Sequence, residues 1–146
     1  MSQEARQNLV DSPNTIFQHD SQRADLLDEN KTQTQLIALL SDLVSKGHII
    51  EFTAIRSDHH DDSGLGFHCH AHGFCSDCWP LASTKPGDYL DASDPRFVQF
   101  CHNAAIDPYE YQEGLAGSAL THAAVIAAGS GFFTDDGGDH IHLGAK

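Results

Sequence analysis

The sequence contains few basic residues and no long hydrophobic run. Its 146 residues include 8 Lys and Arg against 21 Asp and Glu, which gives a formal net charge of −13. Such a charge repels phosphate backbones and anionic lipid headgroups, so we expect no nucleic-acid partner. The apolar runs are also far shorter than the roughly 20 residues that cross a bilayer, so we expect no membrane insertion.

The N-terminus lacks the apolar segment of a secretory signal peptide. We therefore expect synthesis in the cytoplasm without an export route of the chain's own. Cysteine is also sparse, at four residues, which are Cys69, Cys75, Cys78 and Cys101. An even number permits two disulfides, but without an export signal we expect free thiols or metal ligation first. A role as small apolar core residues is the expected alternative to ligation.

Histidine, in contrast, is abundant. The chain has 11 histidines, which is more than its lysines and arginines together. Histidine is the commonest metal ligand and titrates close to neutral pH, so the positions of these residues direct the search for a site. With 146 residues, 40% of them hydrophobic, the chain is long and apolar enough for one domain with its own core.

The first part of the chain divides into a polar segment, a helix and a strand. Residues 1–31 are polar with isolated apolar side chains, which predicts an irregular arm with one short helix that wraps the domain or meets a partner. The alternative for this segment is a disordered tail. From residue 32, apolar residues recur every three or four positions, as in an amphipathic helix that Gly47 ends. Residues 48–56 are rich in β-branched and aromatic residues and predict a strand.

The second part predicts further strands and helices. Residues 57–73 are rich in Asp, His and Gly and predict a loop, and residues 74–81 predict a strand. Asp94-Pro95 is typical of a helix start, and residues 139–143 predict a last strand. Most connections between strands are too short for parallel crossovers. We therefore predict an α+β domain over residues 32–146, with a mainly antiparallel sheet and flanking helices.

Two clusters carry the residues that metal chemistry needs. Residues 68–79 read His-Cys-His-Ala-His-Gly-Phe-Cys-Ser-Asp-Cys-Trp, and residues 139–142 read Asp-His-Ile-His. A catalytic zinc site takes three protein ligands and leaves one position open for water. A nearby carboxylate can act as general base. Two ligands from the first cluster and one from the second would complete such a site only on folding.

The first cluster contains a recognisable signature. His70, Gly73, Cys75 and Asp77 resemble the His-x-x-Gly-x-Ala-x-Asp motif of the zinc peptidases of the D-Ala-D-Ala carboxypeptidase and phage endolysin type. The resemblance implies a Hedgehog/DD-peptidase fold in which His70 and Asp77 bind Zn²⁺. Two departures are Cys75 in place of the usual Ala and His68 where the family often has Ser.

The second cluster extends the resemblance. Asp139 and His142 match a late Asp/Glu-x-x-His of the same family, which implies that His142 is the third zinc ligand and Asp139 the general base. Arg56, before the His- and Asp-rich loop, resembles the family's arginine that polarises the scissile carbonyl. His140 resembles the His-x-His ending of some members, and we expect it to hydrogen-bond the substrate or the transition state.

Other potential ligands in the same region leave a different metal geometry open. They are His59, His60, His68, His72 and Cys69. The main rival is a structural zinc site built from Cys69, Cys75, Cys78 and one histidine. A single Cys-x-x-Cys without a second such pair is a weak zinc motif, which counts against this rival.

The function that the resemblance implies is zinc-dependent cleavage of peptidoglycan stem peptides, by a D,D-carboxypeptidase or a stem-peptide endopeptidase. The absence of a signal peptide suits a phage or prophage product that reaches the bacterial cell wall through a holin or within a virion. A second hypothesis is a non-catalytic phage tail-type protein with a stabilising zinc site, in which residues 1–31 dock onto other phage structural proteins. A tail-borne peptidase would combine the two.

Overall fold

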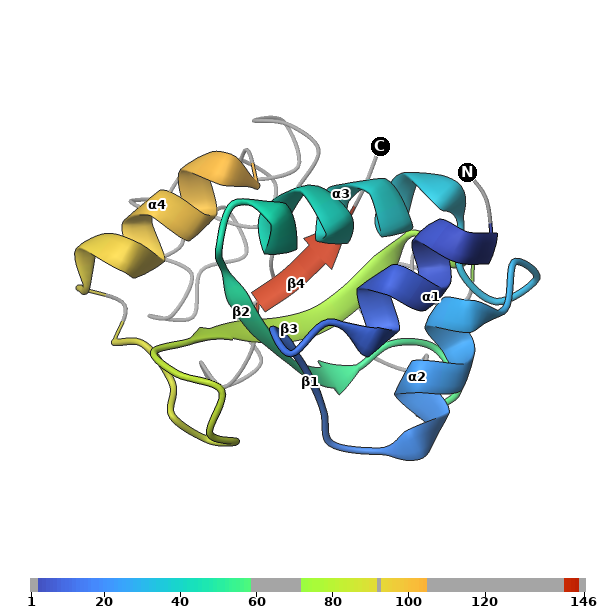
Figure 1. Cartoon of the computed structure of the whole chain (residues 1–146), viewed down its shortest axis with the longest axis horizontal. Helices are drawn as coiled ribbons and strands as arrows, with labels where there is room; N and C mark the ends of the chain where they lie inside the picture. Colours follow the sequence, from blue (N-terminus) through green and yellow to red (C-terminus); the bar gives the residue numbers. More distant parts are fainter. Residues whose placement is uncertain (1–2, 59–71, 92, 105–140, 145–146) are drawn as a thin grey trace, which may run out of the picture.

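The computed structural model describes residues 3–58, 72–91, 93–104 and 141–144 of the chain. These residues form helices and strands that are packed into layers (Figure 1). The elements in chain order are α1 (Gln3–Asp11), β1 (Thr15–Phe17), α2 (Asp20–Leu27), α3 (Thr34–Ser45), β2 (Ile49–Ala54), β3 (Cys75–Leu81), α4 (Pro95–Asn103) and β4 (Ile141–Gly144).

The strands form one mixed sheet in the order β1-β2-β3-β4. β1 pairs with β2 in parallel, whereas β2 with β3 and β3 with β4 are antiparallel. The fold is therefore mixed α and β, but the prediction of a mainly antiparallel sheet is corrected to a mixed one. The parallel pair is possible because α2 and α3 together provide the long crossover that two parallel strands require.

The segment 3–31 differs from the predicted irregular arm, because it forms α1, β1 and α2. Leu9, Val10 and Leu26 are buried in the same hydrophobic core as the sheet. β1 has three residues, which is too short for an alternating pattern to appear in the sequence. The two helices carry few apolar residues each, so their amphipathic character is weak in a polar segment.

Local sequence signals for three other elements are confirmed. α3 lies within the predicted helix and buries Leu36, Ile37, Leu40 and Leu43, and Gly47 after it has a positive φ of 90°. β2 lies within the predicted strand. α4 starts where Asp94 accepts a hydrogen bond of 2.8 Å from the backbone N–H of Arg96, with Pro95 in the first turn. This is the capping arrangement that Asp94-Pro95 predicts.

The two faces of the sheet differ in chemistry. One face carries residues with 0% exposure that share the core cluster with α3, and they are Ile50, Phe52, Cys78, Ile141 and Leu143. We call this the apolar face, and Figure 1 shows α3 lying across the sheet with α1 beside it. Alternation along the strands places Glu51, Asp77 and Trp79 on the opposite side, which we call the polar face although Trp79 also belongs to the core cluster. The register of β4 puts position 142 opposite Asp77.

Candidate functional site

The strand register brings two predicted zinc ligands together. Asp77 on β3 is the direct cross-strand partner of His142 on β4. Directly opposed residues of an antiparallel pair lie on the same face, with Cβ atoms about 4.5–5.5 Å apart. Asp77 is buried, with 4% exposure. A carboxylate and an imidazole are donor types that one zinc ion accepts. The structure describes the backbone of His142, whereas its side chain lies outside the described part.

A β-bulge lies in β2 shortly before Arg56. Phe52 pairs with Cys78 but Ala54 pairs with Asp77, so β2 has one more residue than β3 over this step. A bulge of this kind reverses which residues alternate to which face. The next residue, Ile55, is fully buried in the core cluster. Ala54, the register partner of Asp77, therefore belongs to the polar face, and Arg56 follows in the bend just beyond the end of β2.

The side chain of Arg56 is held by the connection between α2 and α3. Its Nη1 donates hydrogen bonds of 2.9 Å to the backbone carbonyl of Asn30 and 3.0 Å to that of Lys31. Its backbone N–H donates to Oδ2 of Asp25 at 3.2 Å. The guanidinium to which the family resemblance gives a catalytic role is thus hydrogen-bonded to backbone carbonyls of the connection between α2 and α3.

The glycine of the signature approaches the same connection. Gly73 has a φ of 80°, and a Cβ atom built on it would lie 2.6 Å from the carbonyl oxygen of Lys31. Its own carbonyl accepts a hydrogen bond of 2.8 Å from the backbone N–H of Gln33. Both the backbone angle and the lack of space exclude a side chain here. The Lys31 carbonyl therefore contacts Arg56 and also limits the space at Gly73.

Three predicted site residues lie outside the described residues, and these are His70, Asp139 and His140. His59, His60, His68 and Cys69 lie outside them as well, whereas His72 is described and exposed. Among the residues that the structure describes, no group of three His, Cys, Asp or Glu side chains could hold a metal ion. Of the predicted site, the structure describes Asp77, Arg56 and the backbone position of His142 opposite Asp77.

The two described cysteines of the rival zinc site, Cys75 and Cys78, are placed in other roles. Cys75 is disulfide-bonded, in contrast to the expected free thiol or metal ligand. Cys78 is a free thiol on the apolar face, where burial and then the charge of Asp77 raise its pKa. A thiol held in its neutral form is a poor metal ligand, because metals bind the thiolate. Cys78 and Cys101 are buried in the core cluster, which confirms the expectation of small apolar residues for these two.

Two buried carboxylates on this side of the molecule were not singled out from the sequence. Glu51, with 3% exposure, accepts hydrogen bonds from the Tyr89 hydroxyl, from the backbone N–H of Gly87 at 3.0 Å and from Nε2 of Gln18 at 3.2 Å. Asp25, also with 3% exposure, accepts from the backbone of Arg56 and from Ser57. Glu51 has a sequence signal, because it is the single charged residue in an otherwise apolar or hydroxyl-bearing strand.

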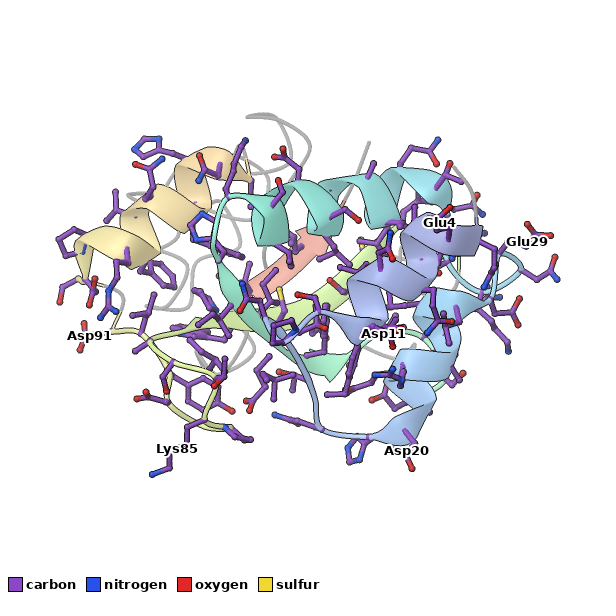
Figure 2. The ribbon with its side chains drawn as sticks, viewed as in Figure 1. Glu4, Asp11, Asp20, Glu29, Lys85 and Asp91 are labelled. Carbon is purple, nitrogen blue, oxygen red and sulfur yellow. The ribbon has the colours of Figure 1, made fainter. Side chains whose placement is uncertain are left out.

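The acidic character of the chain is visible at its surface. Figure 2 labels six side chains, and all of them are exposed: Glu4, Asp11, Asp20, Glu29, Lys85 and Asp91. Five of these six residues are acidic. The surface thus offers little attraction to an anionic polymer, in agreement with the net charge of −13.

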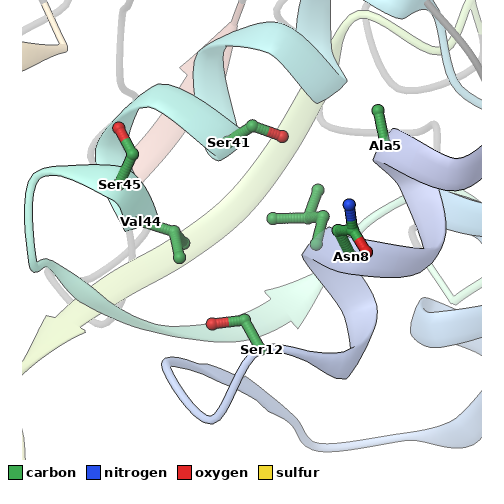
Figure 3. Close-up of a pocket in the computed structure, with 7 residues that line it drawn as sticks. Ala5, Asn8, Ser12, Ser41, Val44 and Ser45 are labelled. Atoms are coloured by element: carbon green, nitrogen blue, oxygen red, sulfur yellow. The ribbon is translucent and has the colours of Figure 1, made fainter.

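A pocket of about 320 Å³ lies between α1 and α3 (Figure 3). Its lining includes the small polar side chains of Asn8, Ser12, Ser41 and Ser45. No residue that lines it is ionisable, so it offers neither a metal ligand nor a general base. It is formed by the two helices and not by the polar face of the sheet, and it is therefore separate from the candidate site.

Comparisons with known proteins add no assignment. The chain matched no protein-family model, and searches of curated proteins and of solved structures found no match either. Within the described residues, no helix has both the length and the apolar character needed to cross a membrane.

Proposed function

We propose that the protein is a zinc-dependent peptidase with a Hedgehog/DD-peptidase-type fold that cleaves peptidoglycan stem peptides. The observation that carries the proposal is the cross-strand pairing of Asp77 with His142. These residues come from two separate sequence clusters, and their backbone positions are cross-strand neighbours in the register of β3 with β4. Arg56, which the family resemblance also names, follows two residues after Ala54, the register partner of Asp77 on β2.

In this proposal, His70, Asp77 and His142 hold the metal ion. When bound, zinc supplies a Lewis acid and lowers the pKa of water to about 7. Two of the three ligands stand on neighbouring strands of one rigid sheet, which limits their relative motion. Such preorganised ligands support a metal site better than ligands on separate loops.

The remaining residues transfer the proton of the attacking water and stabilise the negative charge that develops on the carbonyl oxygen. Asp139 accepts the proton of the attacking water and delivers one to the leaving amine, as a general base and then a general acid. Arg56 places its guanidinium beside the carbonyl oxygen, where negative charge develops in the transition state. His140 hydrogen-bonds the substrate or the transition state. Each role concerns a peptide carbonyl, so the residues serve a D,D-carboxypeptidase and a stem-peptide endopeptidase equally.

The setting that we propose is the bacterial cell wall, reached by a phage or prophage product through a holin or within a virion. The acidic surface gives no general attraction to an anionic wall. Capture of the substrate then depends on local contacts at the polar face or on delivery by other phage proteins.

The decisive experiment measures peptide release from purified sacculi together with zinc content. We expect the wild-type chain to release stem peptides and to bind about one zinc ion per chain. Asp139→Asn should abolish release while zinc content stays near that of the wild type. His142→Gln should lose both, because it removes a ligand. Asp42→Asn, an exposed acidic position on α3, is the matched control and should change neither.

A zinc-bound wild-type chain that releases no peptide would overturn the peptidase proposal and favour a non-catalytic phage tail-type protein. A wild-type chain that binds no zinc but still releases peptides would overturn the metal site. Retention of zinc by His142→Gln would show that the Asp77–His142 pair is not the centre of the site.

A further inference from the structure

Asp25 is a buried carboxylate on α2 that has no part in the proposed chemistry. Its Oδ2 accepts the backbone N–H of Ser57 at 2.7 Å and that of Arg56 at 3.2 Å. Its Oδ1 accepts the Ser57 hydroxyl at 2.6 Å. The carboxylate thus binds the backbone at the point where the chain turns after β2. A buried carboxylate is costly without such donors, so its position is closely specified.

Asp25 is itself held in place by a second layer of hydrogen bonds. The Thr32 hydroxyl donates to the Asp25 carbonyl at 2.8 Å. Buried Arg6 on α1 donates from Nη1 to the Leu26 carbonyl and to the Thr32 hydroxyl, each at 2.8 Å, and from Nη2 to the Thr32 carbonyl at 2.7 Å. These bonds fix α2 and its connection to α3 as one unit. The backbone of Asp25 is therefore held in a fixed position relative to this unit.

This unit binds both the backbone and the side chain of Arg56. Asp25 receives its backbone N–H, and the carbonyls of Asn30 and Lys31 receive its Nη1. Both contacts come from the part of the chain that precedes α3. The direction in which the guanidinium leaves β2 is consequently set by segment 3–32 and not by the sheet alone.

We propose that Asp25 is a positioning residue for Arg56. The inference rests on the proposed peptidase function, in which Arg56 faces the reacting carbonyl. A carboxylate suits the task because its Oδ2 accepts both backbone N–H groups and its charge strengthens these hydrogen bonds, whereas a neutral amide oxygen would bind them more weakly. Displacing a catalytic group by about 1 Å can reduce the rate by about 10²-fold. Asp25 thereby links the N-terminal helices to the site.

The test is a double-mutant cycle on peptide release by the full chain. Asp25→Asn should lower kcat by about 10²-fold in the wild-type background with little change in KM. In the Arg56→Ala background, Asp25→Asn should cause almost no further loss, because the group that it positions is already absent. A purely structural residue would lower the rate by the same factor in both backgrounds, and that result would overturn the proposal. Asp42→Asn is the control.

Amide hydrogen exchange supplies a readout that is independent of activity. We expect the Arg56 and Ser57 amides to exchange at least about 10-fold faster in Asp25→Asn than in the wild type, while the α3 amides keep their protection. Ser57→Ala, which removes one hydrogen bond to Asp25, is a milder variant with the same direction of effect if Asp25→Asn fails to fold. Unchanged exchange at both amides would overturn the positioning role.

The two proposals fail in different ways. A wild-type chain that releases no peptide overturns the peptidase function and, with it, the catalytic consequence of Asp25. An active wild-type chain with equal losses in both backgrounds overturns the Asp25 inference alone.

Discussion

The two faces of the sheet are built on different principles. The apolar face holds fully buried side chains such as Phe52 and Ile141, and each gains stability from the surface that it removes from water. The polar face holds Glu51 and Asp77, which are almost as buried. Burying a carboxylate costs free energy unless specific donors or a metal compensate for it. The comparison teaches that burial on the polar face requires specific partners, whereas burial on the apolar face requires only close packing.

The two faces of the sheet also differ in how strictly each position specifies its residue. An apolar side chain contributes roughly 1.5–3 kcal/mol on burial and tolerates substitution by a residue of similar volume. A buried acid needs donors at fixed positions. Glu51 meets three donors, two of them from the turn at Gly87 and Tyr89 and one from Gln18. The apolar face can therefore vary in sequence more freely than the polar face can.

The largest effect on stability is expected from the apolar face. Phe52→Ala should lower the free energy of unfolding by about 3–5 kcal/mol, because it leaves a cavity in the core between the sheet and α3. Urea denaturation followed by circular dichroism measures this loss. Peptide release per folded molecule should change little, since Phe52 lies on the face opposite Asp77. A loss below about 1 kcal/mol would contradict the assignment of Phe52 to a tightly packed core.

A smaller effect is expected from the polar face. Glu51→Gln keeps the shape but turns an N–H₂ group toward donors, which should cost about 1–3 kcal/mol. Tyr89→Phe is the matched control, because it removes one donor and leaves the carboxylate with Gly87 and Gln18; it should cost about 1 kcal/mol or less. Thermal denaturation of both variants measures the difference. Equal stability of wild type and Glu51→Gln would show that these donors do not need the charged form.

The smallest expected effect is a dependence of stability on pH, which arises from His48 just after the end of α3. Burial, and then the charge of Lys46, lower the pKa of His48 below 6.5, while Asp42 opposes the shift. The neutral ring accepts a hydrogen bond of 2.7 Å from Nδ2 of Asn103 and packs edge-on against Phe100. Below about pH 6.5 the unfolded chain binds a proton that the folded chain resists, so stability is lost as the pH falls.

The His48 effect is isolated by comparing wild type with His48→Gln. Glutamine can accept the same hydrogen bond but does not titrate. The melting temperature of the wild type should therefore fall more steeply than that of the variant between about pH 7 and about pH 5. Parallel curves for the two proteins would assign the acid sensitivity to other groups.

The sequence predicts the elements whose signals are local. The leucine spacing of α3 and the Asp94 cap of α4 depend on neighbours a few positions away, and both predictions are confirmed. β1 depends on a partner strand more than thirty positions later, at Ile50–Phe52, and its three residues carry no pattern. The disulfide at Cys75 likewise depends on tertiary geometry, which a cysteine count cannot supply.

The same distinction between local signals and distant partners applies to the candidate site. The signature names Asp77 and His142 as members of one site, but their direct pairing depends on the register of β3 with β4. The bulge between Phe52 and Ala54, two residues before Arg56, leaves no mark in the sequence. Asp25 was missed because its partners are backbone groups of a distant turn. His70, Asp139 and His140 stay predictions.

The parallel pairing of β1 with β2 has a practical consequence for anyone who shortens the chain. A fragment that starts at Thr32 would leave the outer edge of β2 as a row of unpaired backbone donors and acceptors. Such edges recruit strands from other molecules and promote aggregation. The first thirty residues therefore cover this edge of β2, and they belong in any fragment intended to stay monomeric.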